Sequence, residues 1–171
     1  MQTSLVITIL GPDKVGLVKS LSKTLNQHKG SWTESRMSRL GGKFAGLLEV
    51  SVPADEVEKL TSTLQELQTD SLNILVEQST EDPTLKPTHS LSLEILGQDR
   101  PGIIFDITQK LATLNVNIEE LESEVRPASM SGGSLFNAKL TLGLPEGLSS
   151  EEVQDLLESM SDQFMVDIDV T

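Results

Sequence analysis

The stretch LGPDKVGL at Leu10–Leu17 returns with small changes as LGQDRPGI at Leu96–Ile103. Both copies read Leu-Gly-x-Asp-basic-x-Gly-aliphatic, and an offset of 86 (97 − 11) separates their first glycines. The matched positions are Gly11 and Gly97, Asp13 and Asp99, and Gly16 and Gly102. Self-similarity at a fixed period is typical of a repeated structural unit. We therefore expect two copies of one domain.

The composition fits two small domains. A chain of 171 residues with 37% hydrophobic residues can form two modest cores, in domains of about 80–85 residues each. The apolar run LVITIL at Leu5–Leu10 is too short to cross a membrane and follows no basic segment, so we expect neither a membrane span nor a signal peptide. The absence of cysteine excludes disulfides, thiolate metal sites and cysteine nucleophiles. These features favour a cytoplasmic protein.

The charge balance argues against direct binding to nucleic acid. The sequence has 13 Lys and Arg residues against 26 Asp and Glu residues, which gives a net charge of −13. A field of this sign repels phosphate, and phosphate contacts dominate affinity for nucleic acids. The aromatic residues, four Phe, one Trp and no Tyr, are too few for a surface that stacks bases. We expect partners of another class.

Apolar periodicity predicts the same order of elements on both sides of a polar stretch, EQSTEDPTLKPTH at Glu77–His89. In the first half, alternation predicts strands at 4–10, 44–52 and 72–76, and helical spacing predicts helices at 17–25 and 57–67. In the second half, the corresponding strands are expected at 91–95, 136–144 and 164–170, and the helices at 103–114 and 153–160.

The second strand of each half is predicted from its turn. The segments SWTESRMSRL and VNIEELESEV alternate poorly, but they end in Gly41-Gly42 and in SMSGG, which are signals for a hairpin. After this hairpin, Pro53 of the first half matches Pro145 of the second, an offset of 92 (145 − 53). The second hairpin is therefore six residues longer than the first (92 − 86), and the extra residues fall around RPASMSGG. Each half thus reads β-α-β-β-α-β.

This order predicts an α+β fold with two tandem ferredoxin-like domains. In each domain a four-stranded antiparallel sheet carries two helices on one face. We place the N-terminal domain at residues 1–80, a linker at 81–89 and the C-terminal domain at 90–171. The pairs Asp55 with Glu58 and Ser149 with Glu152 have capping-box spacing, which predicts the starts of the second helices.

The repeated loop joins a strand to a helix, so its amides lie at a helix N-terminus. Such amides and the helix dipole can hold a carboxylate or a phosphate. Asp13 and Asp99 could cap the helix, which makes the loop a structural turn, or accept hydrogen bonds from the ammonium group of a ligand. The stretch lacks the Gly-Lys-Ser/Thr of a phosphate loop. Amides beside one acidic side chain match the two ends of a free amino acid.

The residues DRPGI, followed by a helix and then NVNIEEL at Asn115–Leu121, resemble the ACT regulatory domain, and DKVGL with GSWTES is a looser version of the same pattern. Two such domains without a catalytic domain resemble the glycine cleavage system transcriptional repressor family. The resemblance implies a ligand site where the first loop of one domain meets a neighbouring domain. The candidate positions are Gly11, Asp13, Val15, Gly16, Gly97, Asp99, Arg100, Pro101, Gly102 and Asn117, with Ser31 at the place aligned with Asn117.

The same resemblance implies a function without catalysis. We expect a regulator that senses a small amino acid, glycine above others, and controls glycine-cleavage genes by contacting a DNA-binding activator. The alternative is a constitutive oligomerisation or interaction module whose loops are structural turns. A third and more distant hypothesis, suggested by Arg100 alone, is a hydrolase of acyl phosphates. Paired sheets also suggest a homo-oligomer.

The sequence offers no catalytic or metal-binding pattern. His28 and His89 are the only histidines, and we interpret both as surface residues rather than general bases. Two histidines without cysteine make a transition-metal site improbable, and we expect no cofactor.

Overall fold

The computed structural model describes residues 1–80, 89–128, 132–160 and 164–169. The chain divides into two compact units, an N-terminal unit (Met1–Glu81) and a C-terminal unit (Asp82–Thr171). The elements of the N-terminal unit are β1 (Gln2–Pro12), α1 (Leu17–Gln27), β2 (Ser31–Leu40), β3 (Lys43–Pro53), α2 (Val57–Glu66) and β4 (Asn73–Gln78). Those of the C-terminal unit are β5 (His89–Gln98), α3 (Ile103–Thr113), β6 (Asn117–Pro127), β7 (Ser134–Leu144), α4 (Ser150–Glu158) and β8 (Phe164–Asp169).

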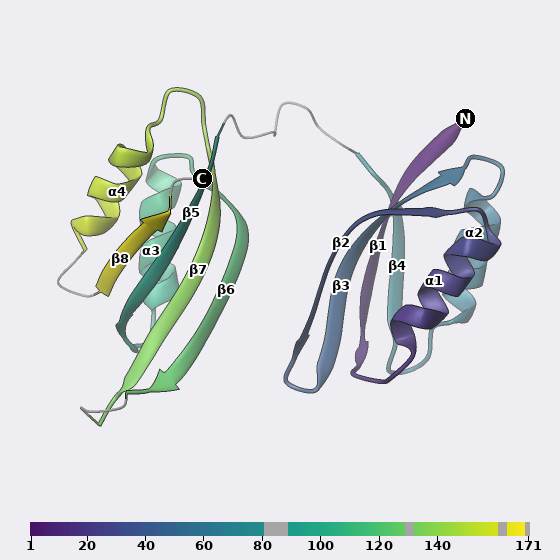
Figure 1. Ribbon diagram of the computed structural model, residues 1–171, viewed down its shortest axis with the longest axis horizontal. Coiled ribbons are helices and arrows are strands. Elements are labelled where there is room, and N and C mark those ends of the chain that lie inside the picture. The colour runs from purple at the N-terminus through teal and green to yellow at the C-terminus, as the bar shows by residue number, and fades with distance from the viewer. Residues whose placement is uncertain (81–88, 129–131, 161–163, 170–171) are drawn as a thin grey trace. The chain divides into compact units, whose positions relative to one another are not determined.

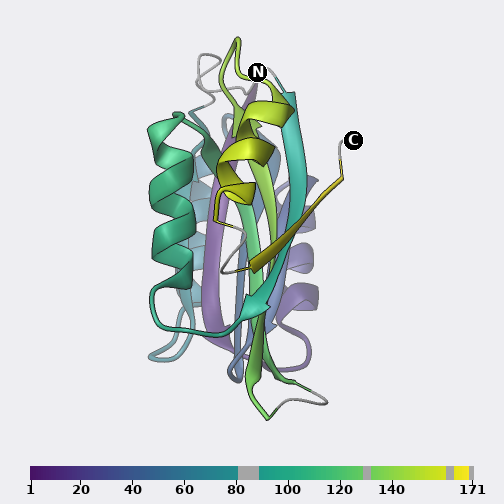
Figure 2. The ribbon, with the colours of Figure 1, turned by 90° about the vertical axis from the view of Figure 1, so that its left-hand side faces the viewer.

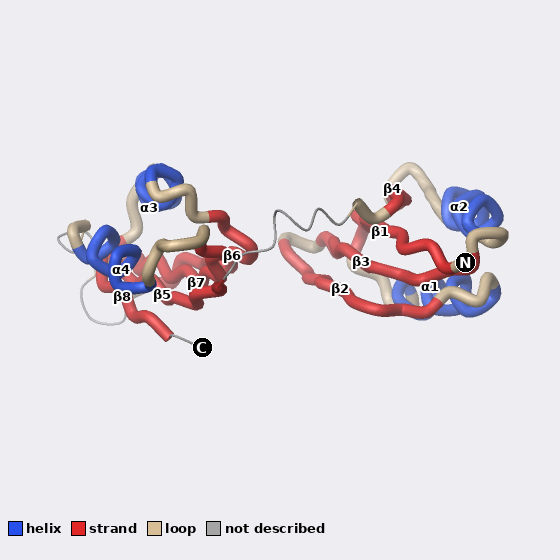
Figure 3. Tube along the Cα trace, turned by 90° about the horizontal axis from the view of Figure 1, so that it is seen from above, coloured by secondary structure: helices blue, strands red, loops and turns tan. Residues whose placement is uncertain are grey.

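Each unit is a four-stranded antiparallel sheet, in the order β2-β3-β1-β4 and, in the second unit, β6-β7-β5-β8. Both helices of a unit lie on the same face of its sheet, as Figures 1 and 3 show for each unit taken separately. In Figure 2 the yellow-green α4 stands in front of the strands that it covers. The predicted βαββαβ order and α+β class are confirmed.

The alternation of apolar residues builds one core in each unit. Leu5, Ile7 and Ile9 of β1 are buried under α1 and α2 together with Leu48 and Val50 of β3. The corresponding residues of the second core include Leu91, Leu93 and Ile95 of β5, and Phe136, Ala138, Leu140, Leu142 and Leu144 of β7. Because side chains alternate along a strand, the residues between them face away from the helices.

The two hairpins differ in length, as the sequence predicted. Gly41 and Gly42 have φ angles of 58° and 76°, the backbone that a tight two-residue turn between twisted strands requires. The longer hairpin is closed by Ala128, whose N–H donates to the carbonyl of Gly133 at 2.8 Å. Met130 in this insertion, Val170 at the end of the last predicted strand and residues 81–88 of the predicted linker lie outside the described residues, and β5 already begins at His89.

The two predicted capping boxes have different outcomes. Ser149 caps α4 as expected, since its hydroxyl accepts from the Glu152 N–H and the Glu152 carboxylate accepts from the Ser149 N–H. These bonds hold the pKa of Glu152 below its usual value. The box at Asp55 is wrong: α2 starts after Glu56, and the described residues provide no side-chain cap there. No helix in the described ranges is long and apolar enough to span a membrane.

This difference gives a matched pair of substitutions. Ser149→Ala should destabilise the C-terminal unit by about 1 kcal/mol, because one helix N–H loses its acceptor. Asp55→Ala should change stability by less than about 0.5 kcal/mol, because that side chain caps nothing. Urea unfolding and hydrogen exchange in α2 and α4 measure both. Equal effects of the two substitutions would contradict this assignment of the caps.

Candidate ligand-binding loops

The repeated stretch forms the turn from the first strand of each unit into its first helix. In the N-terminal unit residues 13–16 connect β1 to α1, and in the C-terminal unit residues 99–102 connect β5 to α3. The last residue before each helix is a glycine in the left-handed conformation, Gly16 with φ 96° and Gly102 with φ 84°. Only glycine adopts this backbone without steric cost, so both glycines have a conformational reason for their place.

Neither aspartate caps its helix, so the alternative in which Asp13 and Asp99 are helix caps is wrong. The N-cap positions are held by Gly16 and Gly102, which have no side chain, and no other described residue supplies a side-chain cap. The first N–H groups of a helix have no partner within it. The amides at the start of α1 and α3 are therefore open to an external acceptor, in the positive field of the helix dipole.

The backbone of each aspartate anchors its loop. The Asp13 N–H donates to the carbonyl of Gly42 in the β2–β3 hairpin at 3.2 Å. The Asp99 N–H donates in the same way to the carbonyl of Ser134 at the start of β7, at 2.9 Å. Both units thus fix the loop against the neighbouring hairpin, and the aspartate carboxylates remain at the surface.

The two loops differ in how their charges are paired. The Asp13 carboxylate accepts a hydrogen bond from Arg39 of β2 at 3.2 Å. In the C-terminal unit Arg100 instead donates to Asp106, in the first turn of α3, at 2.6 Å. Asp99 has no such side-chain partner among the described residues. An acidic group is therefore available beside the amides of α3, and its counterpart in the first loop is already engaged.

Other candidate residues have structural roles or lie on the surface. A Cβ at Gly11 would come within 2.7 Å of Leu72 Cδ1 and 3.4 Å of the Ser71 carbonyl, so this glycine permits close approach of the turn before β4. Gly97 occupies the equivalent position in β5, paired with Phe136. Val15 and Pro101 are exposed at the tips of the loops.

Asn117 does not join the loop within its own unit. It begins β6 and pairs with Gly143, which pairs in turn with Ser90 near the start of β5. The loop at 99–102 follows the opposite end of β5, at Gln98. The antiparallel register therefore separates the two by most of the length of the sheet. Ser31 has the corresponding place at the start of β2.

A cluster around His28 was not predicted from the sequence. His28 follows α1, and its side chain is only 16% exposed, so the interpretation of His28 as a surface residue is wrong. Its Nδ1 lies 3.1 Å from Glu56 Oε2 and its Nε2 lies 3.1 Å from Thr63 Oγ1. Hydrogen bonds from His28 and, second, from Lys59 hold the pKa of Glu56 below its ordinary value. The cluster ties the end of α1 to α2, and the described ranges contain no group of three acidic, His or Cys residues suited to a metal ion.

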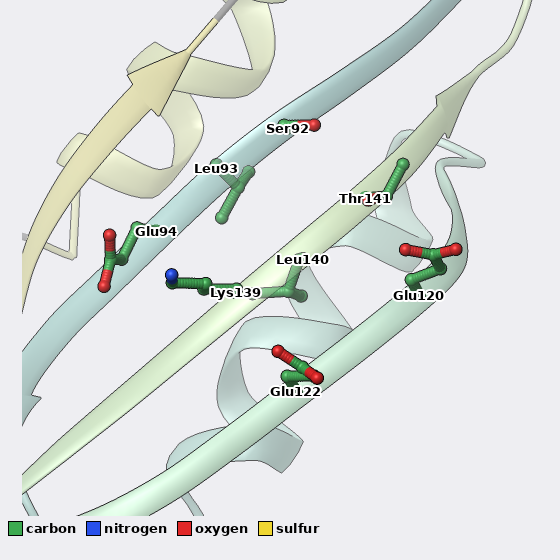
Figure 4. A pocket seen from close by; sticks show the side chains of 8 residues that line it. All are labelled: Ser92, Leu93, Glu94, Glu120, Glu122, Lys139, Leu140 and Thr141. Carbon is green, nitrogen blue, oxygen red and sulfur yellow. The ribbon is translucent and has the colours of Figure 1, made fainter. Parts of the chain in front are cut away.

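A hollow of about 330 Å³ opens on the strands of the C-terminal unit, and no residue of the loop at 99–102 lines it. Figure 4 shows the amine of Lys139 on β7, with Glu94 on one neighbouring strand and Glu122 on the other. Its remaining lining residues are Ser92, Leu93, Glu120, Leu140 and Thr141. None of the ten candidate positions lines this hollow.

Both units match models of one domain family. Residues 3–77 match a model described as the ACT domain, and residues 91–138 match a second model with the same description. The matched ranges begin inside β1 and β5, and both include the repeated loop.

Among characterised proteins, the chain resembles the glycine cleavage system transcriptional repressors of Escherichia coli (strain K12) and Shigella flexneri. Each is 24% identical over 161 residues, which are 93% of this chain and 84% of the relative. Among solved structures, an unknown protein from Galdieria sulphuraria superposes with a TM-score of 0.86 and 28% identity, covering 100% of this chain and 99% of the other. A crystal structure described provisionally as a glycine cleavage system transcriptional repressor gives a TM-score of 0.70 and 17% identity, with 99% and 97% covered, which shows a shared fold.

The left-handed glycine can be tested by substitution. No atom lies within 4 Å of a Cβ built at Gly102, so Gly102→Ala meets only the backbone cost of a positive φ, about 1 kcal/mol or slightly more. Gly102→Asn should cost less, because asparagine tolerates this conformation better than alanine. Urea unfolding of the three proteins provides the comparison. If alanine is tolerated as well as asparagine, the loop does not have this backbone.

Proposed function

This chain belongs to the ACT-domain family, with one ACT domain in each unit, and on that basis we propose that it is a regulatory protein that binds a small amino acid at its strand–helix loops. We propose glycine as the favoured ligand and a DNA-binding transcriptional activator as the partner. In this proposal the chain catalyses no reaction and acts in the cytoplasm.

The observation that carries the proposal is the uncapped start of α3 beside Asp99. A free amino acid has a carboxylate and an ammonium group close together, and it needs hydrogen-bond donors for one and an acidic acceptor for the other. The amides after Gly102 offer the donors, and the Asp99 carboxylate offers the acceptor. We therefore assign the principal site to residues 99–102, with the loop at 13–16 as a second site whose aspartate is already paired with Arg39.

The preference for glycine and for a protein partner rests on two supports. The characterised relatives are named for repression of the glycine cleavage system. The net charge of −13 opposes direct contact with DNA, so control of transcription would pass through a protein that binds DNA itself. Asn117 lies too far from the loop of its own unit to share a ligand with it, so its participation would require the loop of another domain, in this chain or in a second copy.

Calorimetric titration of the full chain with glycine and a panel of other amino acids tests this function. We expect selective binding and, at 100 times the dissociation constant, an increase of about 2.7 kcal/mol in stability. Asp99→Asn should weaken binding at least tenfold, because the ammonium group loses its charged acceptor. Asp55→Asn is the matched control, since Asp55 is another exposed carboxylate just before a helix, and it should leave binding unchanged.

The contrary results separate the alternatives. If no amino acid binds, the chain is a constitutive interaction module and the loops are structural turns. If binding survives Asp99→Asn, the sensor is retained but the assignment of the site is wrong.

A further inference from the structure

The end of α1 meets the start of α2 at a polar contact that we call the histidine joint. It consists of His28, Glu56, Lys59 and Thr63. The side chains of His28 and Glu56 are only 16% and 13% exposed, so their contact is largely removed from water. His28 Nδ1 lies 3.1 Å from Glu56 Oε2, and His28 Nε2 lies 3.1 Å from Thr63 Oγ1. Both ring nitrogens therefore face oxygen atoms.

These oxygen atoms decide how many protons the ring carries. Hydrogen bonds from His28 and then from Lys59 hold the pKa of Glu56 below its ordinary value, so this carboxylate is ionised near neutral pH. An ionised carboxylate only accepts hydrogen bonds, so Nδ1 must donate. The single hydroxyl hydrogen of Thr63 is donated to the carbonyl of Lys59 at 2.9 Å, so the Thr63 oxygen accepts from Nε2. A histidine that donates from both nitrogens is an imidazolium cation.

The helix ends favour these two charges. His28 directly follows α1, and Glu56 directly precedes α2. A cation is stabilised at the C-terminal end of a helix and an anion at the N-terminal end, so each charge suits its own helix as well as the other charge. The charges that oppose a cation here are Lys29 and Lys59, whose Nζ lies 3.1 Å from Glu56 Oε1. Both lysines are exposed, so water and salt screen their repulsion.

The corresponding residues of the C-terminal unit do not titrate. Leu114 follows α3 as His28 follows α1, and it packs against the core. Ser149 precedes α4 as Glu56 precedes α2, and its side chain caps that helix. The same corner of the fold therefore has apolar packing and a helix cap in one unit, and charged hydrogen bonds in the other.

We propose that the histidine joint is a proton-dependent contact, in which His28 takes up a second ring proton as the N-terminal unit folds and release of that proton weakens the contact between α1 and α2. After the proton leaves to solvent, one ring nitrogen faces an oxygen without a hydrogen between them. The Thr63 hydroxyl can restore the bond only by turning from the Lys59 carbonyl to Nε2. Either outcome loses one hydrogen bond and the positive charge beside Glu56. This proposal is independent of ligand binding at the loops.

The direction of the pH dependence follows from these protons. An ordinary imidazole titrates at about pH 6.5, so below that pH the ring is charged in the folded and the unfolded chain and the contact is complete. As the pH rises further, folding must take up a proton from solution, and the stability of the N-terminal unit falls. The lowered pKa of Glu56 acts at the acid end, where its contribution is present above 4.5 and is lost as the pH falls. The contact is therefore strongest in mildly acidic solution.

Trp32 reports on this unit alone, because it is the single tryptophan of the chain and packs against the N-terminal core. In urea unfolding of the full chain followed by Trp32 fluorescence, the folding equilibrium constant should fall about tenfold between about pH 6 and about pH 8.5. His28→Leu, which copies Leu114, should remove this fall because the joint then carries no titrating ring. Glu56→Gln, which keeps the shape of the side chain without its charge, should reduce it.

His89→Leu is the matched control, because His89 is the other histidine of the chain and begins β5 in the C-terminal unit. The fall measured through Trp32 should persist in this variant. Ring ¹⁵N spectra of the unmodified chain give a reading that depends on no substitution: His28 should keep both ring protons to a higher pH than His89 does. Release of the proton at the same pH from both histidines would overturn the proposal. So would a fall in stability that survives His28→Leu.

Discussion

The turn from the first strand into the first helix is the constraint on which each unit depends. A central strand must reverse into a helix that packs on its own sheet, and the chain does so over residues 13–16 and 99–102. A left-handed glycine makes this reversal possible, and a backbone bond from the preceding aspartate to the hairpin fixes its direction. Since glycine has no side chain to cap the helix, the geometry that forms the fold also leaves the first amides available to a ligand.

Duplication preserved this scaffold and allowed the two surfaces to diverge. The anchoring bonds, the left-handed glycines and the cores correspond between the units. The pairing of charges does not correspond between the units. Asp13 is paired with Arg39, but Asp99 has no corresponding partner among the described residues. Leu47 of β3 corresponds to Lys139 of β7. The units therefore differ in the charges that they carry at corresponding positions, and in the proposed function the principal ligand site is the C-terminal loop.

Local patterns in the sequence predicted the strands, the helices, both hairpins and the cap at Ser149. Features that depend on contacts distant in sequence were missed. The cluster of His28 with Glu56 and Thr63 joins residues 28 and 35 positions apart, and no short motif signals it. The separation of Asn117 from the loop follows from antiparallel register, which spacing along the chain does not reveal. Asp13 and Asp99 have a residue type suited to an N-cap, but the left-handed glycine occupies that position.

The most direct measurement of the central claim is a glycine titration of ¹⁵N-labelled protein followed by amide chemical shifts. If the uncapped helix start holds the ligand carboxylate, the amides of Ile103, Ile104 and Phe105 should shift together and saturate, and those at the start of α2 should stay in place. Shifts confined to the hollow around Lys139, or no saturable shift at either loop, would contradict the account.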